Sequence, residues 1–327
     1  ENLKCDIEDN VAGTGVGGRI LDVLKRKGYQ TSSNSVDAGE GLLKGFASDN
    51  SPVWSVSLKD PIRLDQYSSV GPNMFDLVKN LNGVGSDDDS FLGSTWSVMT
   101  SKALYEYEKS LEYAELFDSD EFDMSHYPES LDTLHNRFRS VAQFMKMRTV
   151  RKVNREVFML RHDGFDSHSE SKTVINEMFK ESNNVIKTFV NEMKLQGIWE
   201  NVVIVMGSEF GRSISPNSSG GSDHGWGGNY FVLGGSLKGK QILGQYPEQL
   251  SKESDQWISR GRIIPTTPWE NIWHGIAQWM GVLDNDDLLK ALPNMKNFRK
   301  CDMFTDQDLF VDGQVPTYDC ANMDEDN

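Results

Sequence analysis

The pattern of apolar and polar positions along the chain predicts alternating strands and helices. Short apolar runs predict buried strands at 157–160, 202–206 and 230–233, with further candidates at 33–36 and 53–58. Apolar residues at helical spacing predict helices over about 17–28, 74–82, 97–117, 130–150 and 172–196. The order strand, helix, strand predicts that 157–160 and 202–206 lie in one parallel sheet, joined right-handedly through the helix at 172–196.

A last helix is predicted after Thr267, because Thr267 and Glu270 form a capping-box pattern with Pro268 at the first helical position. Its aromatic and aliphatic residues recur at helical spacing and are expected in the core. The elements predict one α/β domain over 1–300, with a helical insert or cap at about 74–150.

The remaining residues, 301–327, are predicted to form an acidic C-terminal tail with little apolar content. Cys301 and Cys320 bracket this tail, and a disulfide between them is the simplest way to hold it. Cys5 is then left over, as a free thiol or as the partner of a cysteine outside this sequence.

The charge balance narrows the classes of partner. Lys and Arg number 33 against 49 Asp and Glu, which gives a formal net charge of −16 over 327 residues. Such a chain repels phosphate backbones and anionic membranes, so we expect no nucleic-acid partner. No apolar run approaches the roughly 18 residues of a membrane span.

Other features favour a secreted protein. The sequence begins at Glu1 without a basic-then-apolar leader, so a segment N-terminal to it is expected to be missing. Asn217 begins an Asn-Ser-Ser triplet in a Pro/Ser/Gly loop, which makes it a candidate glycosylation site. Together with the expected disulfide, these features predict a secreted or extracellular location.

Five side chains in three loops are candidate metal ligands. They follow or precede predicted strands, where ligands gather in parallel α/β sheets, and they are Asp166, His168, Glu209, Asp223 and His224. Mixed nitrogen and oxygen ligands suit zinc, manganese or iron. The cofactor expected is a divalent metal, with zinc, manganese and calcium as the candidates. Each also has a plain structural interpretation: an Asx turn for Asp166, a helix cap or a pair with Arg212 for Glu209, and hydrogen bonding in a Gly-rich bend for Asp223 and His224.

The order of these motifs resembles a known family. The stretches are GFDSH at 164–168, VVIVMGSEFGR at 202–212 and GSDHG at 221–225, the last running into YFVLGG at 230–235. They closely resemble domain-of-unknown-function family 1501, a branch of the alkaline phosphatase and sulfatase superfamily. The resemblance extends from about 15–19 to the helix at 269.

The resemblance implies helices on both faces of a mixed, mainly parallel sheet, with a metal-assisted phosphate- or sulfate-ester site at strand ends. One metal would take Asp166, His168 and His224. The second would take an Asp-His pair, but the chain has Glu209 and Phe210 there, and phenylalanine cannot ligate. The superfamily's first strand, with its catalytic nucleophile, is expected upstream of residue 1. A missing segment or another chain would have to complete the sheet.

Three functions are weighed on this basis. The first is a secreted metal-dependent hydrolase of phosphate or sulfate esters, and the second is a non-catalytic extracellular structural or ligand-binding protein that keeps the fold. The third is a calcium-binding surface protein, drawn from the acidic runs at 87–89 and 118–123. Those runs lack the glycine and distal glutamate of a calcium loop, so solvated acidic loops explain them better.

Overall fold

The computed structural model describes residues 13–46, 53–56, 96–97, 100, 104, 113, 116, 119–128, 130 and 132–322, which form a mixed α/β fold. Three parallel strands make its first sheet, in the order β2-β1-β3: β1 (Thr31–Val36), β2 (Val53–Ser55) and β3 (Arg155–Leu160). In the central strand, Ser33 pairs with Val53 on one side and with Val157 on the other. The predicted strands at 33–36 and 157–160 are therefore confirmed, and the strand predicted at 53–58 ends earlier.

Two antiparallel pairs complete the strands: β4 (Val203–Val205) with β5 (Val232–Gly234), and β6 (Trp257–Ile258) with β7 (Arg262–Ile263). The prediction that 157–160 and 202–206 share one sheet is wrong, because β3 and β4 belong to separate sheets. β1 pairs with one edge of β3, and β5 pairs with one edge of β4. Within the described residues, no ladder joins β3 to β4.

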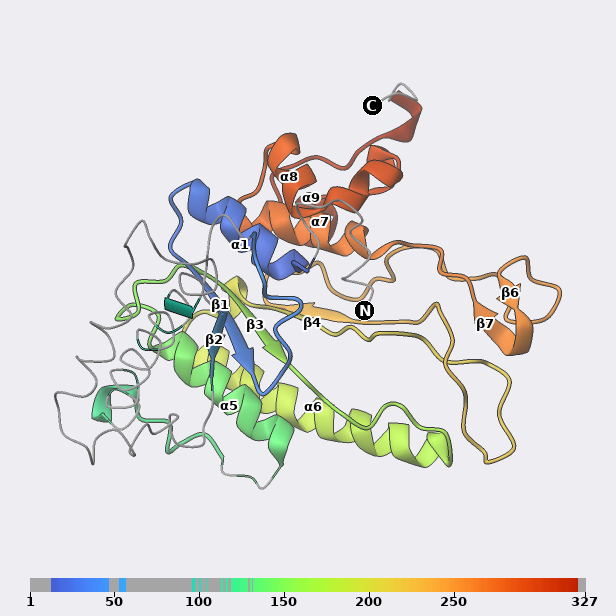
Figure 1. Cartoon of the computed structure of the whole chain (residues 1–327), viewed down its shortest axis with the longest axis horizontal. Helices are drawn as coiled ribbons and strands as arrows, with labels where there is room; N and C mark the ends of the chain where they lie inside the picture. Colours follow the sequence, from blue (N-terminus) through green and yellow to red (C-terminus); the bar gives the residue numbers. More distant parts are fainter. Residues whose placement is uncertain are drawn as a thin grey trace.

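Helices cover both sides of the strands (Figure 1). On one side lie α1 (Val16–Arg26), α7 (Trp269–Met280), α8 (Asn285–Ala291) and α9 (Asp306–Leu309), and on the other α5 (Thr133–Lys146) and α6 (Ser171–Leu195). Val157 and Val203 pack into the cluster on the α1 side, whereas Phe158 and Ile204 pack into the cluster on the α6 side. β3 and β4 therefore contact the same two helical layers.

The helices α1, α5 and α6 begin and end within a few residues of the bounds that the apolar spacing predicts. One difference is at α7, where Pro268 is the N-cap and makes no side-chain capping bond. Pro268 has extended backbone angles (φ −72°, ψ 157°), so Thr267 lies one residue too early for the predicted capping box. The expected helix at 74–82 lies outside the described residues, as does most of 97–117. Short 3₁₀ turns occur at Asp120–Phe122, Trp199–Asn201, Ser259–Gly261, Pro293–Asn297, Lys300–Asp302 and Cys320–Asn322.

The C-terminal segment is part of the core rather than a loosely held tail. The predicted disulfide between Cys301 and Cys320 is present, with the two Cα atoms 5.1 Å apart. Inside the loop that it closes, Leu309 and Phe310 are each only 1% exposed and belong to the core cluster that also contains residues of α1 and α7. Burial and the disulfide therefore hold this segment together. Among the described residues, none of the helices combines the length and apolarity that a membrane crossing requires.

Candidate metal centre

The first loop of the site leaves β3 and leads into α6. The hydroxyl of Ser167 donates to the carbonyl of Ser169 over 2.7 Å, and the hydroxyl of Ser171 donates back to the carbonyl of Ser167 over 2.9 Å. Because Ser171 is the first residue of α6, these bonds fix the loop to the start of that helix. The side chains of Asp166 and His168, on either side of Ser167 in sequence, remain exposed to solvent.

The second loop, before β5, lies against the first. Ser169 and Gly220 form a β-bridge, and the amide of Asn217 donates to the carbonyl of His168 over 2.9 Å. The amide oxygen of Asn217 accepts two backbone N–H groups of its own loop, which closes an Asx-type turn. A Cβ at Gly221 would lie 2.1 Å from the carbonyl carbon of His168. Only glycine permits this approach of the two backbones.

Arg212 lies near the start of the long connection from β4 to β5 and joins the later part of that connection to the loop after β3. Its Nε donates to the hydroxyl of Ser222 over 3.0 Å, and its Nη2 donates to the carbonyl of Ser167 over 2.6 Å and also to that of Ser222. Its Nη1 donates to the carboxylate of Asp166. The guanidinium group thus gathers segments that follow two different strands, and this fixes where Asp166 lies.

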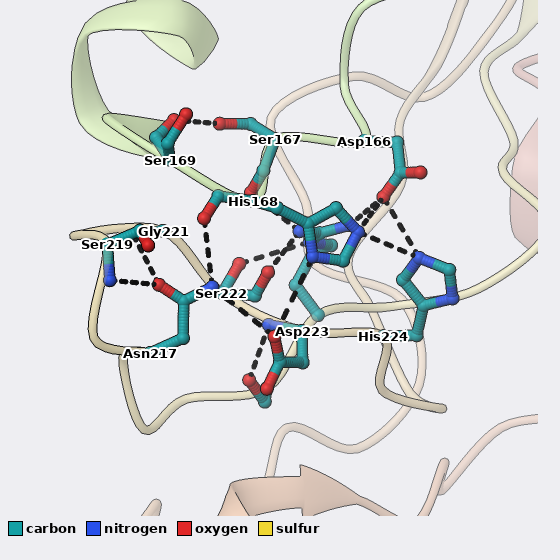
Figure 2. Close-up of polar contacts among 12 residues, drawn as sticks. Asp166, Ser167, His168, Ser169, Asn217, Ser219, Gly221, Ser222, Asp223 and His224 are labelled. Atoms are coloured by element: carbon teal, nitrogen blue, oxygen red, sulfur yellow. Dashed lines mark hydrogen bonds and ion pairs between the residues drawn. The ribbon is translucent and has the colours of Figure 1, made fainter.

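Three ligand atoms meet at this junction (Figure 2). Oδ1 of Asp166 lies 3.1 Å from Nε2 of His168 and 3.0 Å from Nε2 of His224, and the two Nε2 atoms are 3.1 Å apart. The three atoms form an almost equilateral triangle whose side chains are all exposed. We call these three residues the ligand triangle.

The donor set and spacing of the ligand triangle fit a divalent transition metal. Bonds of about 2.1 Å at right angles place neighbouring ligands about 3.0 Å apart, and two histidines with one carboxylate on one face are a known iron(II) arrangement. Tetrahedral zinc with bonds of about 2.0–2.2 Å separates its ligands by about 3.3–3.6 Å, so zinc would need a small outward movement. Calcium, which takes oxygen ligands, suits the two imidazoles poorly.

The side chains of Asp166, in the triangle, and Asp223, beside it, both favour their ionised form. Partial desolvation would raise the pKa of Asp166, but the hydrogen bond from Arg212 and the neighbouring imidazoles outweigh it, and the pKa is lowered. The hydrogen bond from Asn217 lowers the pKa of Asp223, helped by the charge of Arg260. Asp166 is therefore a carboxylate at neutral pH, which is the form that binds a cation.

Two of the five candidate ligands lie outside the ligand triangle. Asp223 approaches the other nitrogen of His168, with its Oδ1 3.6 Å from Nδ1. Glu209 accepts a hydrogen bond from Ser208 over 3.4 Å and helps, after burial, to raise the pKa of Tyr230. The structure therefore brings Asp166, His168 and His224 together, as the family motif implies, with Asp223 directly behind His168.

Two contributors to the site were not predicted as such. The sequence suggests Glu209 as the partner of Arg212, whereas in the structure Arg212 pairs with Asp166. Asn217 was predicted to carry a glycan, and in the structure its Nδ2 donates to both His168 and Asp223. A glycan on Nδ2 would take the place of one of these bonds. Both residues lie inside the motif loops, and this position is the sequence signal that they belong to the site. The sequence pattern does not show which side chain or backbone group each of them contacts.

The comparisons with known proteins bear on the family alone. The model of the family described as "Protein of unknown function (DUF1501)" matches residues 74–266, more than half of the chain. Neither the curated proteins nor the solved structures contain a significant match to this sequence. The matched region includes all three loops of the site. On this evidence the chain belongs to the DUF1501 family.

Proposed function

We propose that this protein is a metal-dependent hydrolase of phosphate or sulfate esters with an alkaline phosphatase-like fold. The observation that carries the proposal is the ligand triangle of Asp166, His168 and His224, in which two imidazoles and one carboxylate face one point from loops at strand ends. All three side chains are about half exposed, so an ester could reach them from solvent.

The chain's own residues would hold the ion and keep the site in shape. Asp166, His168 and His224 would ligate zinc, manganese or iron, while Arg212 keeps the loops together. When bound, the ion supplies positive charge that offsets charge on the ester oxygens and lowers the pKa of a coordinated water. Phe210 stands where the superfamily has a second histidine ligand, so we propose one metal per site.

The nucleophile is proposed to come from a further strand between β3 and β4. β1, paired on both edges, buries the polar residues Ser32, Ser33, Asn34 and Ser35, whereas the apolar positions of β3 and β4 are only half-buried. β3 and β4 each have an edge that no strand of the described residues pairs with. Apolar strands that are less buried than a serine-rich one favour an additional partner at such an edge. Both β3 and β4 lead into the site, so a strand between them would also end there.

Hydrogen exchange on the protein from its natural source tests the added strand. If a strand pairs with the second edge of β3, we expect every backbone amide of Arg155–Leu160 to exchange slowly. If the amides not bonded to β1 exchange at unprotected rates, the proposal of a completing strand is wrong.

Metal content tests the hydrolase proposal most directly. We expect elemental analysis of the purified protein to find about one transition-metal ion per chain, and a His224→Ala variant to lose it. Asp163→Asn is the matched control. Asp163 lies three residues before Asp166, and its exposed carboxylate pairs with Arg161. It should keep the metal. Near-zero metal in wild type and variants alike, even after incubation with Zn²⁺ or Mn²⁺, would overturn the proposal.

The alternative is a non-catalytic extracellular binding protein, favoured by one observation. The ring of Phe210 covers the imidazole of His224, with 4.0 Å between the ring centroids, in the region where a second ion would bind. Assays with small aryl phosphates and aryl sulfates separate the two functions. Metal-dependent hydrolysis that is lost in His224→Ala supports the enzyme, whereas bound metal without hydrolysis in the complete native protein supports the binding protein.

We also propose a secreted or extracellular location. The disulfide between Cys301 and Cys320 supports it, since such bonds persist in oxidising compartments. Fractionation of the source cells with thiol labelling provides the test. Recovery of the protein inside the cell with both cysteines reduced would contradict this location.

A further inference from the structure

Asp223 lies on the side of His168 that faces away from the ligand triangle. Oδ1 of Asp223 is 3.6 Å from Nδ1 of His168, while Nε2 of the same ring is 3.1 Å from both Asp166 and His224 (Figure 2). The two ring nitrogens direct their lone pairs or protons along different directions. A carboxylate at Nδ1 therefore meets a different part of the ring from an ion held at Nε2.

The carboxylate of Asp223 is itself held from two sides. Nδ2 of Asn217 donates to Oδ1 over 3.3 Å, and Nη1 of Arg260 lies 2.5 Å from Oδ2. The side chain of Asp223 is 24% exposed, against 50% for that of His168. Asp223 is thus less accessible and more fully bonded than the imidazole in front of it.

The β6–β7 region presents Arg260 to Asp223. Arg260 has a left-handed backbone conformation (φ 66°), and its carbonyl accepts the backbone N–H of Ser215 over 3.2 Å. The next residue, Gly261, accepts the N–H of Ile214 over 3.0 Å. These bonds attach the turn between β6 and β7 to the loop that carries Asp223, which keeps the guanidinium group beside the carboxylate.

We propose that Asp223 is a positioning residue that orients His168 and selects its tautomer, rather than a metal ligand. A neutral imidazole carries one proton. Asp223 favours this proton on Nδ1, which leaves the lone pair of Nε2 directed at the ligand triangle, whereas Asp166, whose Oδ1 is 3.1 Å from Nε2, favours it on Nε2 as long as no cation lies between them. The opposite tautomer would place the Nδ1 lone pair against a negative oxygen. The 3.6 Å separation is expected to shorten into a hydrogen bond when Nε2 binds an ion, as such contacts tighten in the occupied site.

The inference rests on the proposed metal site for its purpose, but its first test needs no metal. The test uses metal-free Asp166→Ala protein labelled with ¹⁵N-histidine, in which no carboxylate of residue 166 competes for the proton at Nε2. At a pH above the usual histidine pKa, we expect His168 in this background to carry its proton on Nδ1. The loss of one signal set in His168→Gln assigns the resonances. In the same background, Asp223→Ala should shift His168 toward the Nε2–H tautomer. Asp223→Asn, which keeps an acceptor oxygen, should shift it less, and Asp163→Asn should leave it unchanged.

The second test measures the affinity for Zn²⁺ and the coordination of Co²⁺. Loss of an orienting partner is expected to weaken Zn²⁺ binding about 10- to 100-fold in Asp223→Ala, and less in Asp223→Asn. The visible spectrum of bound Co²⁺ should keep its shape in both variants, since the ligands are the same. A changed spectrum would show that Asp223 is a ligand and would overturn the inference.

The outcomes separate this inference from the proposed function. If no metal binds but the tautomer of His168 depends on Asp223, the metal site is wrong and the positioning role stands. If metal binds in wild type but the tautomer in the Asp166→Ala background is Nε2–H, or is unchanged by Asp223→Ala, the positioning role is wrong and the metal site stands. Circular dichroism of each variant checks that it remains folded.

Discussion

The ring of Phe210 stacks on the imidazole of His224, with centroids 4.0 Å apart and ring planes 21° apart. His224 belongs to the ligand triangle, and the stacked ring limits how its imidazole can turn. Phenylalanine at position 210 cannot ligate a metal, and its ring supports the imidazole of His224, a member of the ligand triangle. This contact is compatible with the one ion per site that we propose.

Removing this ring should weaken metal binding moderately. Aromatic pairs contribute about 0.5–1.5 kcal/mol beyond their buried area, so Phe210→Ala is expected to lower the affinity for Zn²⁺ or Mn²⁺ about 2- to 12-fold. Isothermal titration of the metal-free protein measures the change. Phe179→Ala is the control, because Phe179 is an exposed ring on α6 that contacts Phe165. Equal affinities in wild type and Phe210→Ala would show that the stacking does not support His224.

Gly221 is expected to be essential for bringing the two ligand loops together. The Cβ of Gly221→Ala would lie 2.1 Å from the backbone of His168, so the loops must separate. We expect metal affinity to fall about 10- to 100-fold, and the free energy of unfolding to fall by about 1–3 kcal/mol. The matched control is Gly239→Ala, where a Cβ would meet no atom within 4 Å. If both variants bind metal as wild type does, the close approach is not required.

His274 should make the stability of the protein depend on pH. It is fully buried, and its Nδ1 lies 2.8 Å from the carbonyl of Phe304, to which it donates. Burial lowers the pKa of His274. As the pH falls, this histidine is therefore protonated in the unfolded chain before it is protonated in the folded protein. His274 leaves the free energy of unfolding unchanged above a pH of about 6.5. Below that pH it lowers the free energy of unfolding by up to about 1.4 kcal/mol per pH unit.

The variant His274→Asn keeps a donor for Phe304 but cannot be protonated. We expect urea unfolding at pH 7.5 and pH 5.5 to show a smaller loss of stability for this variant than for wild type. The comparison uses the change with pH, because the smaller side chain lowers stability at both values. An identical pH dependence in the two proteins would show that His274 does not titrate as expected.

Removing the disulfide should cost stability without releasing the C-terminal segment. In the chain-entropy model, closing a loop of this size contributes on the order of 3 kcal/mol. The variant Cys301→Ala/Cys320→Ala is expected to unfold at lower urea concentration. Leu309 and Phe310 remain in the core cluster that also contains residues of α1 and α7, so the segment should stay protected in hydrogen exchange. Rapid exchange at 303–310 in folded protein would show that the disulfide alone holds it.

The sequence by itself determined the local elements and the candidate ligands. Apolar spacing is a local property, so α1, α5, α6 and the apolar strands β3 and β4 could be located within a few residues. The spacing of Cys301 and Cys320 within a polar segment was enough to propose their bond. The three motif loops also contained every ligand of the triangle, because side chains with metal-binding chemistry are visible in the sequence itself.

Only the tertiary structure decided how these parts meet. Which edge of β3 is paired depends on β1, more than a hundred residues earlier, and no periodicity within a strand encodes that choice. The pairing of Arg212 with Asp166 and the place of Asp223 behind His168 depend on a backbone approach that only Gly221 permits. Composition gives the chemistry of a side chain, whereas its role as ligand or positioning residue follows from which atom of its neighbour it faces.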